Sequence, residues 1–208
     1  MINSFSVVNA HLYHDILPSQ YRLRHRVFVQ RAGWDVPDYN EMEFDQFDTP
    51  ATVYLVWRDH QGECRAITRL IPTEMPYMLK SLWPQMVSDI ELPSQPNIWE
   101  ATRFGVDDCL SPKQRKEVMG ELVCGCLEYG LLNGIDHYLC AMPRQIIKFS
   151  LMRAGCDVDF IGDELDMGGY PMRAARINIT QESLDKVRGR FGINQSVLTA
   201  PYPEEIAA

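Results

Sequence analysis

The order of secondary-structure patterns along the chain is the feature that most constrains its fold. Two strand patterns, 51–58 and 64–70, are joined by the short turn Asp59-His60-Gln61-Gly62 and predict a β-hairpin. From position 97 onward, strand and helix patterns mostly alternate. A hairpin followed by alternation argues against a doubly wound parallel sheet. It predicts an α/β sandwich around one mixed sheet.

The other elements follow from apolar periodicity and capping residues. Ser111 and Pro112 suit the N-cap and first position of a helix that runs to 132, where Asn133-Gly134 ends it. Similar reasoning predicts helices over 17–31 (capped near Ser19), 79–86, 143–155 and 181–190, and strands over 97–106, 135–142, 157–161 and 172–179. We expect a single domain over residues 1–208, with 192–208 as a loose tail.

Composition excludes several classes of protein. The chain has 208 residues, 46% of them hydrophobic, which suits a globular domain rather than a disordered scaffold. No run approaches the roughly 18 apolar residues of a membrane span, and the first ten residues lack a secretory signal, so we expect no membrane insertion. A net charge of −8 disfavours a nucleic-acid binder. We interpret the six cysteines as small buried residues in a reducing cytoplasm.

Common cofactor and metal motifs are missing from the sequence. It contains no GxGxxG, GxxxxGK[ST], GxSxG or HExxH pattern. No Cys/His cluster has the spacing of a zinc site. We therefore expect neither a metal nor a bound cofactor.

Charged side chains lie where apolar ones are expected, in the strands 64–70 and 97–106 and in an acidic loop over 35–48. Each group alone is explained by structural salt bridges or by a solvated loop. Aromatic residues interleave with the carboxylates of the loop, however, so we expect the loop to fold onto the protein, where its carboxylates need cationic partners. The candidate partners nearly balance: Arg24, Arg69 and Arg103 against Glu43, Asp45, Asp48 and Glu100. By strand periodicity, Glu100 and Arg103 are expected on opposite faces.

These positions together resemble the signature of the acyl-homoserine lactone synthases, the autoinducer synthases of quorum sensing. The matching pattern is Arg24-x3-Phe28-x5-Trp34, Glu43-x-Asp45-x2-Asp48, Arg69 and Glu100-x2-Arg103. The surrounding segments RLIPTEMPYML (69–79), WEATRFGV (99–106) and RAG (153–155) are also similar to the family. The resemblance covers roughly residues 20–180. Position 102 is Thr in this sequence, whereas many members carry Ser. The difference is small, because both side chains carry a hydroxyl group.

The resemblance implies a fold and a reaction. The fold would be similar to that of the N-acetyltransferases, with a splayed mixed sheet and a V-shaped cleft. The substrates would be S-adenosylmethionine, consumed rather than used as a cofactor, and an acyl thioester on acyl carrier protein or coenzyme A. The amine of S-adenosylmethionine would take the acyl group, and lactone closure would then release methylthioadenosine. An acyl-CoA-dependent N-acyltransferase of the same fold, acting on another amine, is the alternative.

The resemblance also suggests roles for the matching residues. Phe28 and Trp34 would line the S-adenosylmethionine pocket, with Trp34 near the sulfonium. Asp45 and Asp48 would hold the ammonium or pair with Arg24 and the other arginines. Arg69 and Arg103 are the candidates for binding the carboxylate. Glu43 or Glu100 would accept the proton of the amine, and we favour Glu100 because a strand places a base more rigidly than a loop. Backbone N–H groups at a strand bulge would stabilise the oxyanion.

The donor side is expected near the strands 97–106 and 135–142 and the helix that follows. Residues 136–142 contain no Thr or Ser, so we expect a plain or branched acyl group rather than a 3-oxo one, with Met142 at the pocket floor. Both donors are anionic, so docking needs a local basic cluster on this acidic protein. Arg144 and Lys148 share one helix face and are the first candidates. The cluster Lys113, Arg115 and Lys116 is the second.

Overall fold

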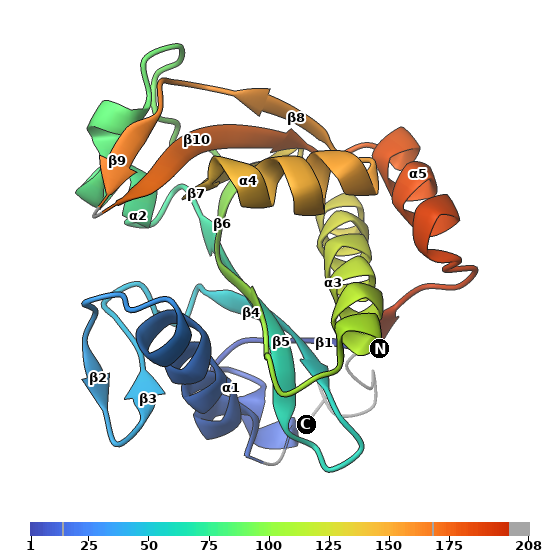
Figure 1. Cartoon of the computed structure of the whole chain (residues 1–208). Helices are drawn as coiled ribbons and strands as arrows, with labels where there is room; N and C mark the ends of the chain where they lie inside the picture. The colour runs from blue at the N-terminus through green and yellow to red at the C-terminus, as the bar shows by residue number, and fades with distance from the viewer. Residues whose placement is uncertain (14, 168, 200–208) are drawn as a thin grey trace.

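A nine-stranded mixed sheet forms the centre of the molecule in a computed structural model, which describes residues 1–13, 15–167 and 169–199 (Figure 1). The strands run in the order β11-β1-β4-β5-β6-β7-β10-β8, with β9 paired to β10. Their bounds are β1 Ile2–Phe5, β4 Val53–Arg58, β5 Cys64–Pro72, β6 Ile98–Val106, β7 His137–Pro143, β8 Asp157–Phe160, β9 Leu165–Met167, β10 Tyr170–Asn178 and β11 Leu198–Thr199. A separate hairpin, β2 (Asp38–Tyr39) with β3 (Met42–Glu43), lies in the acidic loop.

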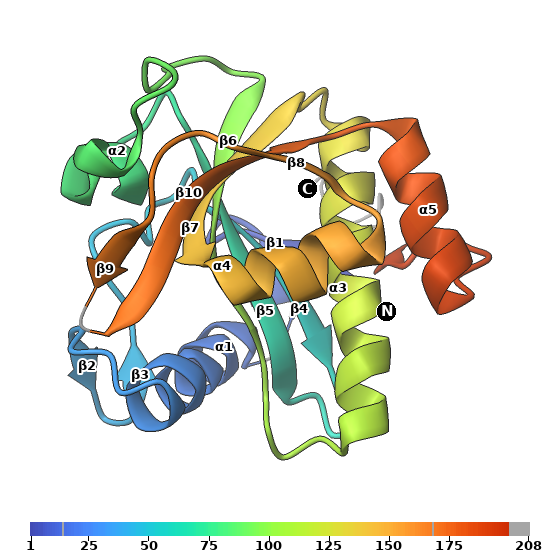
Figure 2. The same ribbon diagram turned by 45° about the horizontal axis from the view of Figure 1, so that its top comes forward.

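Helices cover both faces of the sheet (Figures 1 and 2). They are α1 (Ile16–Arg24), continued by the π-helical η2 (His25–Arg31); α2 (Met78–Leu82); α3 (Pro112–Leu132); α4 (Arg144–Ile146), continued by η4 (Ile147–Leu151) and η5 (Met152–Ala154); and α5 (Gln181–Phe191), with short 3₁₀ turns η1 (Ala10–Leu12) and η3 (Pro84–Met86).

The alternation of side chains along β4 shows that α1 and α3 pack against different faces of the sheet. Tyr54 and Val56 belong to the same apolar cluster as Leu23 of α1. Leu55, between them, belongs to the cluster that contains Leu122 of α3. Because successive strand residues point to opposite faces, α1 and α3 must cover opposite sides of the sheet. The predicted α/β sandwich with a mixed sheet is confirmed.

The sheet divides between β6 and β7. These neighbours are parallel, and their pairing covers only Ile98–Glu100 against His137–Leu139. Beyond that point the strands separate, so that β1, β4 and β5 lie on one side of a fork and β10 and β8 on the other (Figure 1). The V-shaped cleft expected from the resemblance therefore has a structural basis.

The predicted start of α3 is confirmed. The Ser111 hydroxyl accepts the N–H of Gln114, and the Gln114 side chain accepts the N–H of Ser111, which completes a capping box. The prediction of a cap near Ser19 is wrong, because the first helix begins at Ile16. Ser19 is buried inside α1, where its hydroxyl donates to Glu63 and accepts the N–H of Cys64.

The prediction of a loose tail is wrong for its described part. Glu128 of α3 is buried and accepts hydrogen bonds from Ser196 Oγ and from the N–H groups of Val197 and Leu198. These bonds anchor β11, which pairs in parallel with β1. Residues 200–208 lie outside the described part. Among the helices that the structure does describe, none is long and apolar enough to cross a membrane.

Candidate active site

Six charged side chains form a buried ionic network below the fork. Arg24 Nε lies 2.6 Å from Glu43 Oε2, and Arg24 Nη1 lies 2.7 Å from Asp48 Oδ1. Arg103 Nη2 lies 2.8 Å from both Glu43 Oε1 and Asp45 Oδ2. Arg69 also binds both aspartates, with Nη1 at 2.6 Å from Asp45 Oδ1 and 2.9 Å from Asp48 Oδ1. The acidic loop thus folds onto three arginines, as its interleaved aromatics suggested.

The network fixes the ionisation of its carboxylates. Burial alone would raise the pKa of Glu43, but hydrogen bonds from Arg103 and Arg24 lower it to about 2. Burial likewise opposes ionisation of Asp48, but Arg24 and Arg69 hold its pKa well below its usual range. Glu43 is therefore ionised at neutral pH, with both oxygens bound by guanidinium groups. It is poorly suited to take up a proton.

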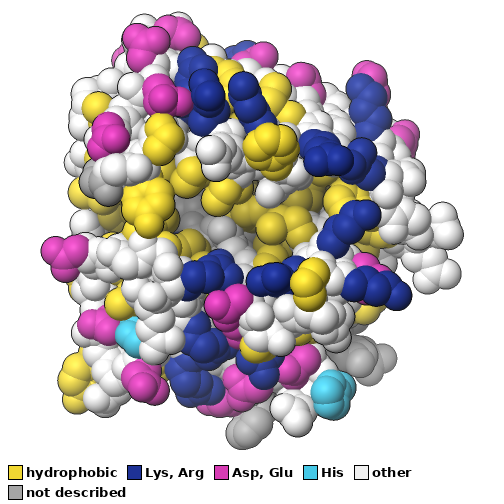
Figure 3. All heavy atoms as spheres, in the orientation of Figure 1, with side chains coloured by type: hydrophobic (Ala, Val, Ile, Leu, Met, Phe, Trp, Pro, Cys, Tyr) yellow, Lys and Arg dark blue, Asp and Glu magenta, His cyan; other side chains and the backbone are white. Residues whose placement is uncertain are grey.

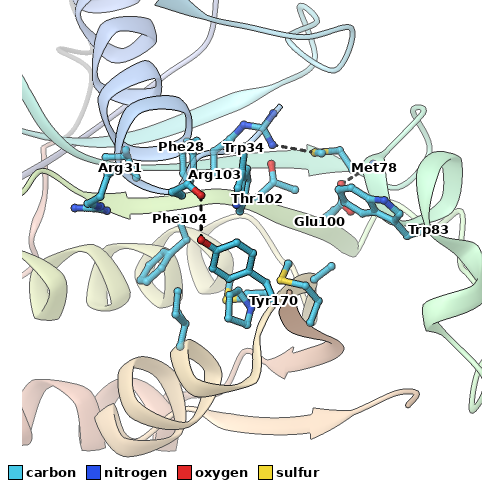
Figure 4. A pocket seen from close by; sticks show the side chains of 17 residues that line it. Phe28, Arg31, Trp34, Met78, Trp83, Glu100, Thr102, Arg103, Phe104 and Tyr170 are labelled. Atoms are coloured by element: carbon cyan, nitrogen blue, oxygen red, sulfur yellow. Dashed lines mark hydrogen bonds between the residues drawn. The ribbon is translucent and has the colours of Figure 1, made fainter. Parts of the chain in front are cut away.

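The fork itself contains a cavity of about 340 Å³ (Figure 4). Phe28 of η2 and Trp34, in the segment that follows η2, line it, and their rings stack with centroids 5.0 Å apart. β6 contributes Glu100 and Arg103, and β7 contributes Met142. The structure therefore brings five of the predicted site residues into one cavity. Arg24, Glu43, Asp48 and Arg69 lie behind its wall, in the ionic network.

A second cavity of about 540 Å³ adjoins the first. It is lined by residues 33–37, which follow η2, and by Asp45 and Phe47 of the acidic loop. The two cavities share six lining residues: Trp34, Met78, Trp83, Arg103, Tyr170 and Met172. Two adjoining chambers with a common wall suit a reaction between two substrates.

Arg103 reaches the fork because β6 bulges. The register between β5 and β6 shifts between Ile67 and Arg69, which lie opposite Gly105 and Thr102, so β6 carries an extra residue. Arg103 has a φ of +52°, in the left-handed region. The expectation that Glu100 and Arg103 point to opposite faces is wrong, since both line the fork cavity. A bulge resets strand alternation, and periodicity alone does not reveal it.

Among the described residues that line the fork cavity, Glu100 is the one buried carboxylate. Its oxygens accept the N–H groups of Met78, at 2.8 Å, and Leu79, at 2.6 Å (Figure 4). Burial raises its pKa to about 7, although these hydrogen bonds and the nearby Arg69 and Arg103 act in the opposite direction. Glu100 therefore exchanges a proton near neutral pH, as a general base requires.

Sequence reasoning missed several lining residues. Met78 and Trp83 lie in the connection between β5 and β6, residues 73–97, which is rich in Pro and Met. A connection of this length in a compact domain is usually functional, and that was the one signal available. The Met78 sulfur lies 3.0 Å from Arg69 Nη2 and 3.5 Å from Arg103 Nη1, so it accepts from two arginines. Tyr170 had no recognisable signal, because it reaches the cavities only through the pairing of β9 and β10.

The predicted docking residues lie on a helix that contributes Ile146 to the lining of the fork cavity. Arg144 and Lys148 are exposed on the helix that follows β7. Arg144 Nε is 3.5 Å from Glu164 Oε2, a half-exposed pair. Phe149 on the same helix is 67% exposed, and Ile146 lines the cavity. Figure 3 shows hydrophobic side chains inside the hollow and Lys and Arg side chains along much of its rim.

Comparison with known proteins identifies the family. Residues 9–187 match the family model of the autoinducer synthases. The chain belongs to the autoinducer synthase family. This autoinducer synthase is 30% identical over 188 residues to an acyl-homoserine-lactone synthase of Pseudomonas aeruginosa, covering 86% of this chain and 90% of that protein. It is also 30% identical over 199 residues to the isovaleryl-homoserine lactone synthase of Bradyrhizobium diazoefficiens, covering 93% and 86%.

Solved structures agree with this assignment. A CoA-dependent acyl-homoserine lactone synthase, solved with MTA, matches with a TM-score of 0.87 at 28% identity, covering 96% of this chain and 92% of that one. A structure described as an N-acetyltransferase from Lactobacillus plantarum matches with a TM-score of 0.56 at 15% identity, which shows a shared fold. The autoinducer synthase is therefore an acyltransferase that makes an acyl-homoserine lactone, and the function expected from its sequence is confirmed.

Proposed function

We propose that this synthase joins its two substrates where the two cavities meet, with S-adenosylmethionine in the larger cavity and the acyl thioester in the fork. The observation that carries this assignment is the shared wall, which places Arg103 in both cavities and Glu100 in the fork cavity alone. A relative solved with SAM and isopentyl-CoA binds the same pair of substrate classes.

The reaction consists of two displacements. First, the α-amine of S-adenosylmethionine attacks the thioester carbonyl; an N–C bond forms, the C–S bond breaks, and the thiolate leaves to take a proton. Second, the carboxylate of the same molecule attacks its own γ-carbon; a C–O bond forms, the bond to the sulfonium breaks, and methylthioadenosine leaves. The amine has an ordinary pKa of about 8, so it must lose a proton before it attacks.

Glu100 is proposed as the proton acceptor. With a pKa of about 7, Glu100 is about half ionised at neutral pH and mostly ionised above it, and this pKa is close enough to that of the amine for efficient proton transfer. Each of its oxygens accepts one backbone N–H and keeps a further lone pair for a proton. The oxyanion that forms on the carbonyl would be bound by backbone N–H groups of the bulge at Arg103 and Phe104.

Arg103 is proposed to bind the carboxylate of S-adenosylmethionine, because it is the one arginine of the network that lines both cavities. Asp45, in the second cavity, would hold the ammonium. Trp34 would contact the sulfonium through its ring, with Phe28 stacked behind it. Arg69 is fully buried against Asp45 and Asp48, so we assign it to positioning Asp45 rather than to gripping substrate.

The donor is proposed to be a plain or branched acyl group on acyl carrier protein or coenzyme A. The acyl chain would lie along β7, whose His137–Pro143 sequence offers it no Ser or Thr hydroxyl, with Met142 at the end of the fork cavity. Arg144 and Lys148 would dock the anionic carrier at the rim. We further propose a cytoplasmic location, which agrees with six free cysteines, and a reaction without metal or bound cofactor.

Mass spectrometry of an organic extract from cells that express the chain tests this function. We expect a lactone ion, and from the purified protein equal amounts of lactone, methylthioadenosine and free thiol, unchanged by EDTA. The Arg69→Ala variant should lose most output, whereas Arg22→Ala, in an exposed pair with Asp15, should not. An N-acyl product of another amine, or activity restored only by an added metal, would contradict the proposal.

A further inference from the structure

A hydrogen bond crosses the mouth of the fork and connects its two sides. The Tyr170 hydroxyl, at the start of β10, donates to the backbone carbonyl of Ala32 at 3.2 Å. The two residues lie 138 positions apart in the chain. In Figure 4 the Tyr170 ring rises from the β10 side towards the end of η2, between the labelled side chains of Trp34 and Phe104.

Each partner in this bond is tied to the walls of both cavities. Ala32 lines the fork cavity, and the residues directly after it, 33–37, line the second cavity. Trp34 N–H donates to Phe28 O at 2.9 Å, so the chain that leaves Ala32 is fixed to the stacked aromatic wall. On the other side, Tyr170 lines both cavities together with Met172 of the same strand.

We propose that Tyr170 is a positioning residue whose bond to Ala32 couples the two substrate cavities. A ligand in the second cavity contacts residues 33–37 on one side and Tyr170 and Met172 on the other, so it favours the separation at which the bond forms. The same separation sets the width of the fork cavity, and a ligand there favours the same state. By linkage, each ligand then raises affinity for the other by an equal factor.

The hydrogen bond between Tyr170 and Ala32 is suited to this role because it contributes only a small free energy. Tyr170 is 46% exposed, and a neutral hydrogen bond of this kind contributes only about a two- to tenfold preference. Such a bond biases the separation of the two sides without preventing substrate entry. The backbone around Tyr170 is shaped independently of Ala32, because Gly169, at a φ of +87°, donates its N–H to Asp166 Oδ1 at 2.9 Å.

The inference rests on the proposed two-substrate site, and a binding cycle tests it. Calorimetry would measure the affinity of S-adenosylmethionine with and without an unreactive thioether analogue of the acyl-pantetheine donor, and the reverse. For the wild type we expect each ligand to tighten the other by about fivefold or more. Tyr170→Phe, which removes only the hydroxyl, should reduce this factor to about twofold or less, while each single affinity changes by less than about threefold.

The control is Tyr39→Phe, which makes the same chemical change on the β2–β3 hairpin, where Tyr39 is 66% exposed and lines neither cavity. It should keep the wild-type coupling factor. A loss of structure alone would weaken both single affinities and lower the melting temperature, and would not selectively remove the coupling. Full coupling in Tyr170→Phe, or two ligands that bind the wild type independently, would overturn the role of Tyr170. Failure of either ligand to bind the wild type would instead overturn the proposed function.

Discussion

Arg103 adopts a backbone conformation that residues other than glycine rarely adopt, and the contacts of its side chain explain how this conformation is maintained. A left-handed φ in a residue other than glycine costs on the order of 1–3 kcal/mol. Its guanidinium offsets this cost through Glu43 and Asp45 and lies within 5.9 Å of the ring centroids of Phe28 and Trp34. Arg103 therefore links three features of the site: the ionic network, the stacked rings of Phe28 and Trp34, and the bulge in β6. Strain of this kind at a bound charge is typical of a preorganised site.

The pH dependence of the rate should report Glu100. Its pKa is raised to about 7, so its ionised, proton-accepting fraction falls as pH drops through 7, and kcat/KM should fall about tenfold per unit below that value. Glu100→Gln should lower kcat by roughly 10²-fold and remove this ionisation from the profile. Glu117→Gln, on the exposed surface of α3, is the control. A wild-type rate that stays constant between pH 5.5 and 8 would contradict the assignment.

Met142 should limit the length of the acyl chain. Behind the fork cavity lies a small apolar cavity of about 30 Å³ lined by Val123, Leu127 and Leu151, and the two share Phe104 and Met142 as their dividing wall. Met142→Ala would join them, so the preferred acyl chain should lengthen by about two to four carbons. The same change should lower the free energy of unfolding by about 2–5 kcal/mol. Product masses from a mixture of donors provide the measurement, with Met75→Ala in an exposed loop as the control. An unchanged distribution of product masses would show that Met142 does not limit the length of the acyl chain.

At the scale of elements, β6 and the acidic loop depend on each other. The loop supplies Glu43, Asp45 and Asp48, and the arginines that bind them come from α1, β5 and β6. A buried ion pair contributes little net stability compared with apolar packing, but removal of one partner leaves an unpaired charge. The loop is therefore held in place by the same elements that build the cavity wall.

Arg24→Ala should destabilise the fold as well as the site. It leaves Glu43 and Asp48 short of a partner, and we expect a loss of about 3–5 kcal/mol in the free energy of unfolding. The pKa of Glu43 is lowered to about 2 in the folded state, so its contribution is full above its unfolded pKa and is lost as pH falls from about 4.5 towards 2. Denaturant titrations at pH 7 and pH 3 measure both effects. If Arg24→Ala matched the control Arg22→Ala at pH 7, the network would not be stabilising.

The helix after β7 should dock the donor. Arg144→Glu combined with Lys148→Glu reverses two exposed charges on this helix, so the KM for the donor should rise about tenfold, with the KM for S-adenosylmethionine little changed. The matched control is Lys113→Glu with Lys116→Glu, on the exposed first turn of α3. If the control variant raised the donor KM and the α4 variant did not, docking would lie at α3 instead.

Sequence patterns predicted the elements well where the signal is local. The capping box at Ser111 and Gln114 and the hairpin of β4 and β5 depend on neighbouring residues, and the structure confirms both. The bulge at Arg103 depends on pairing with β5, and the β11 strand depends on Glu128, some 70 residues away. Long-range partners of this kind leave no periodic trace, so Tyr170 and the tail were missed for the same physical reason.

At the scale of the whole molecule, charge is unevenly distributed. The chain carries a net charge of −8, yet Lys and Arg side chains lie along much of the rim of the hollow in Figure 3. The acidic surplus keeps anionic partners away from most of the surface, and the rim offers them a local attraction. The site residues that could be predicted from sequence are those of the charged pattern, together with Phe28, Trp34 and Met142, which the family resemblance suggested. The rest of the lining, such as Met78, Trp83 and Tyr170, could be identified only from the fold.

The ionic network pairs three arginines with three carboxylates, and this balance has a consequence for ionic strength. A cluster whose charges cancel projects little field beyond a few ångströms, and its buried members are shielded from dissolved ions. Recognition of S-adenosylmethionine should therefore change little between 50 and 300 mM sodium chloride. The rim is solvent-exposed and unbalanced, so the donor KM should rise several-fold over the same range. A single salt titration followed with both substrates would thus separate short-range recognition from long-range attraction without any mutation.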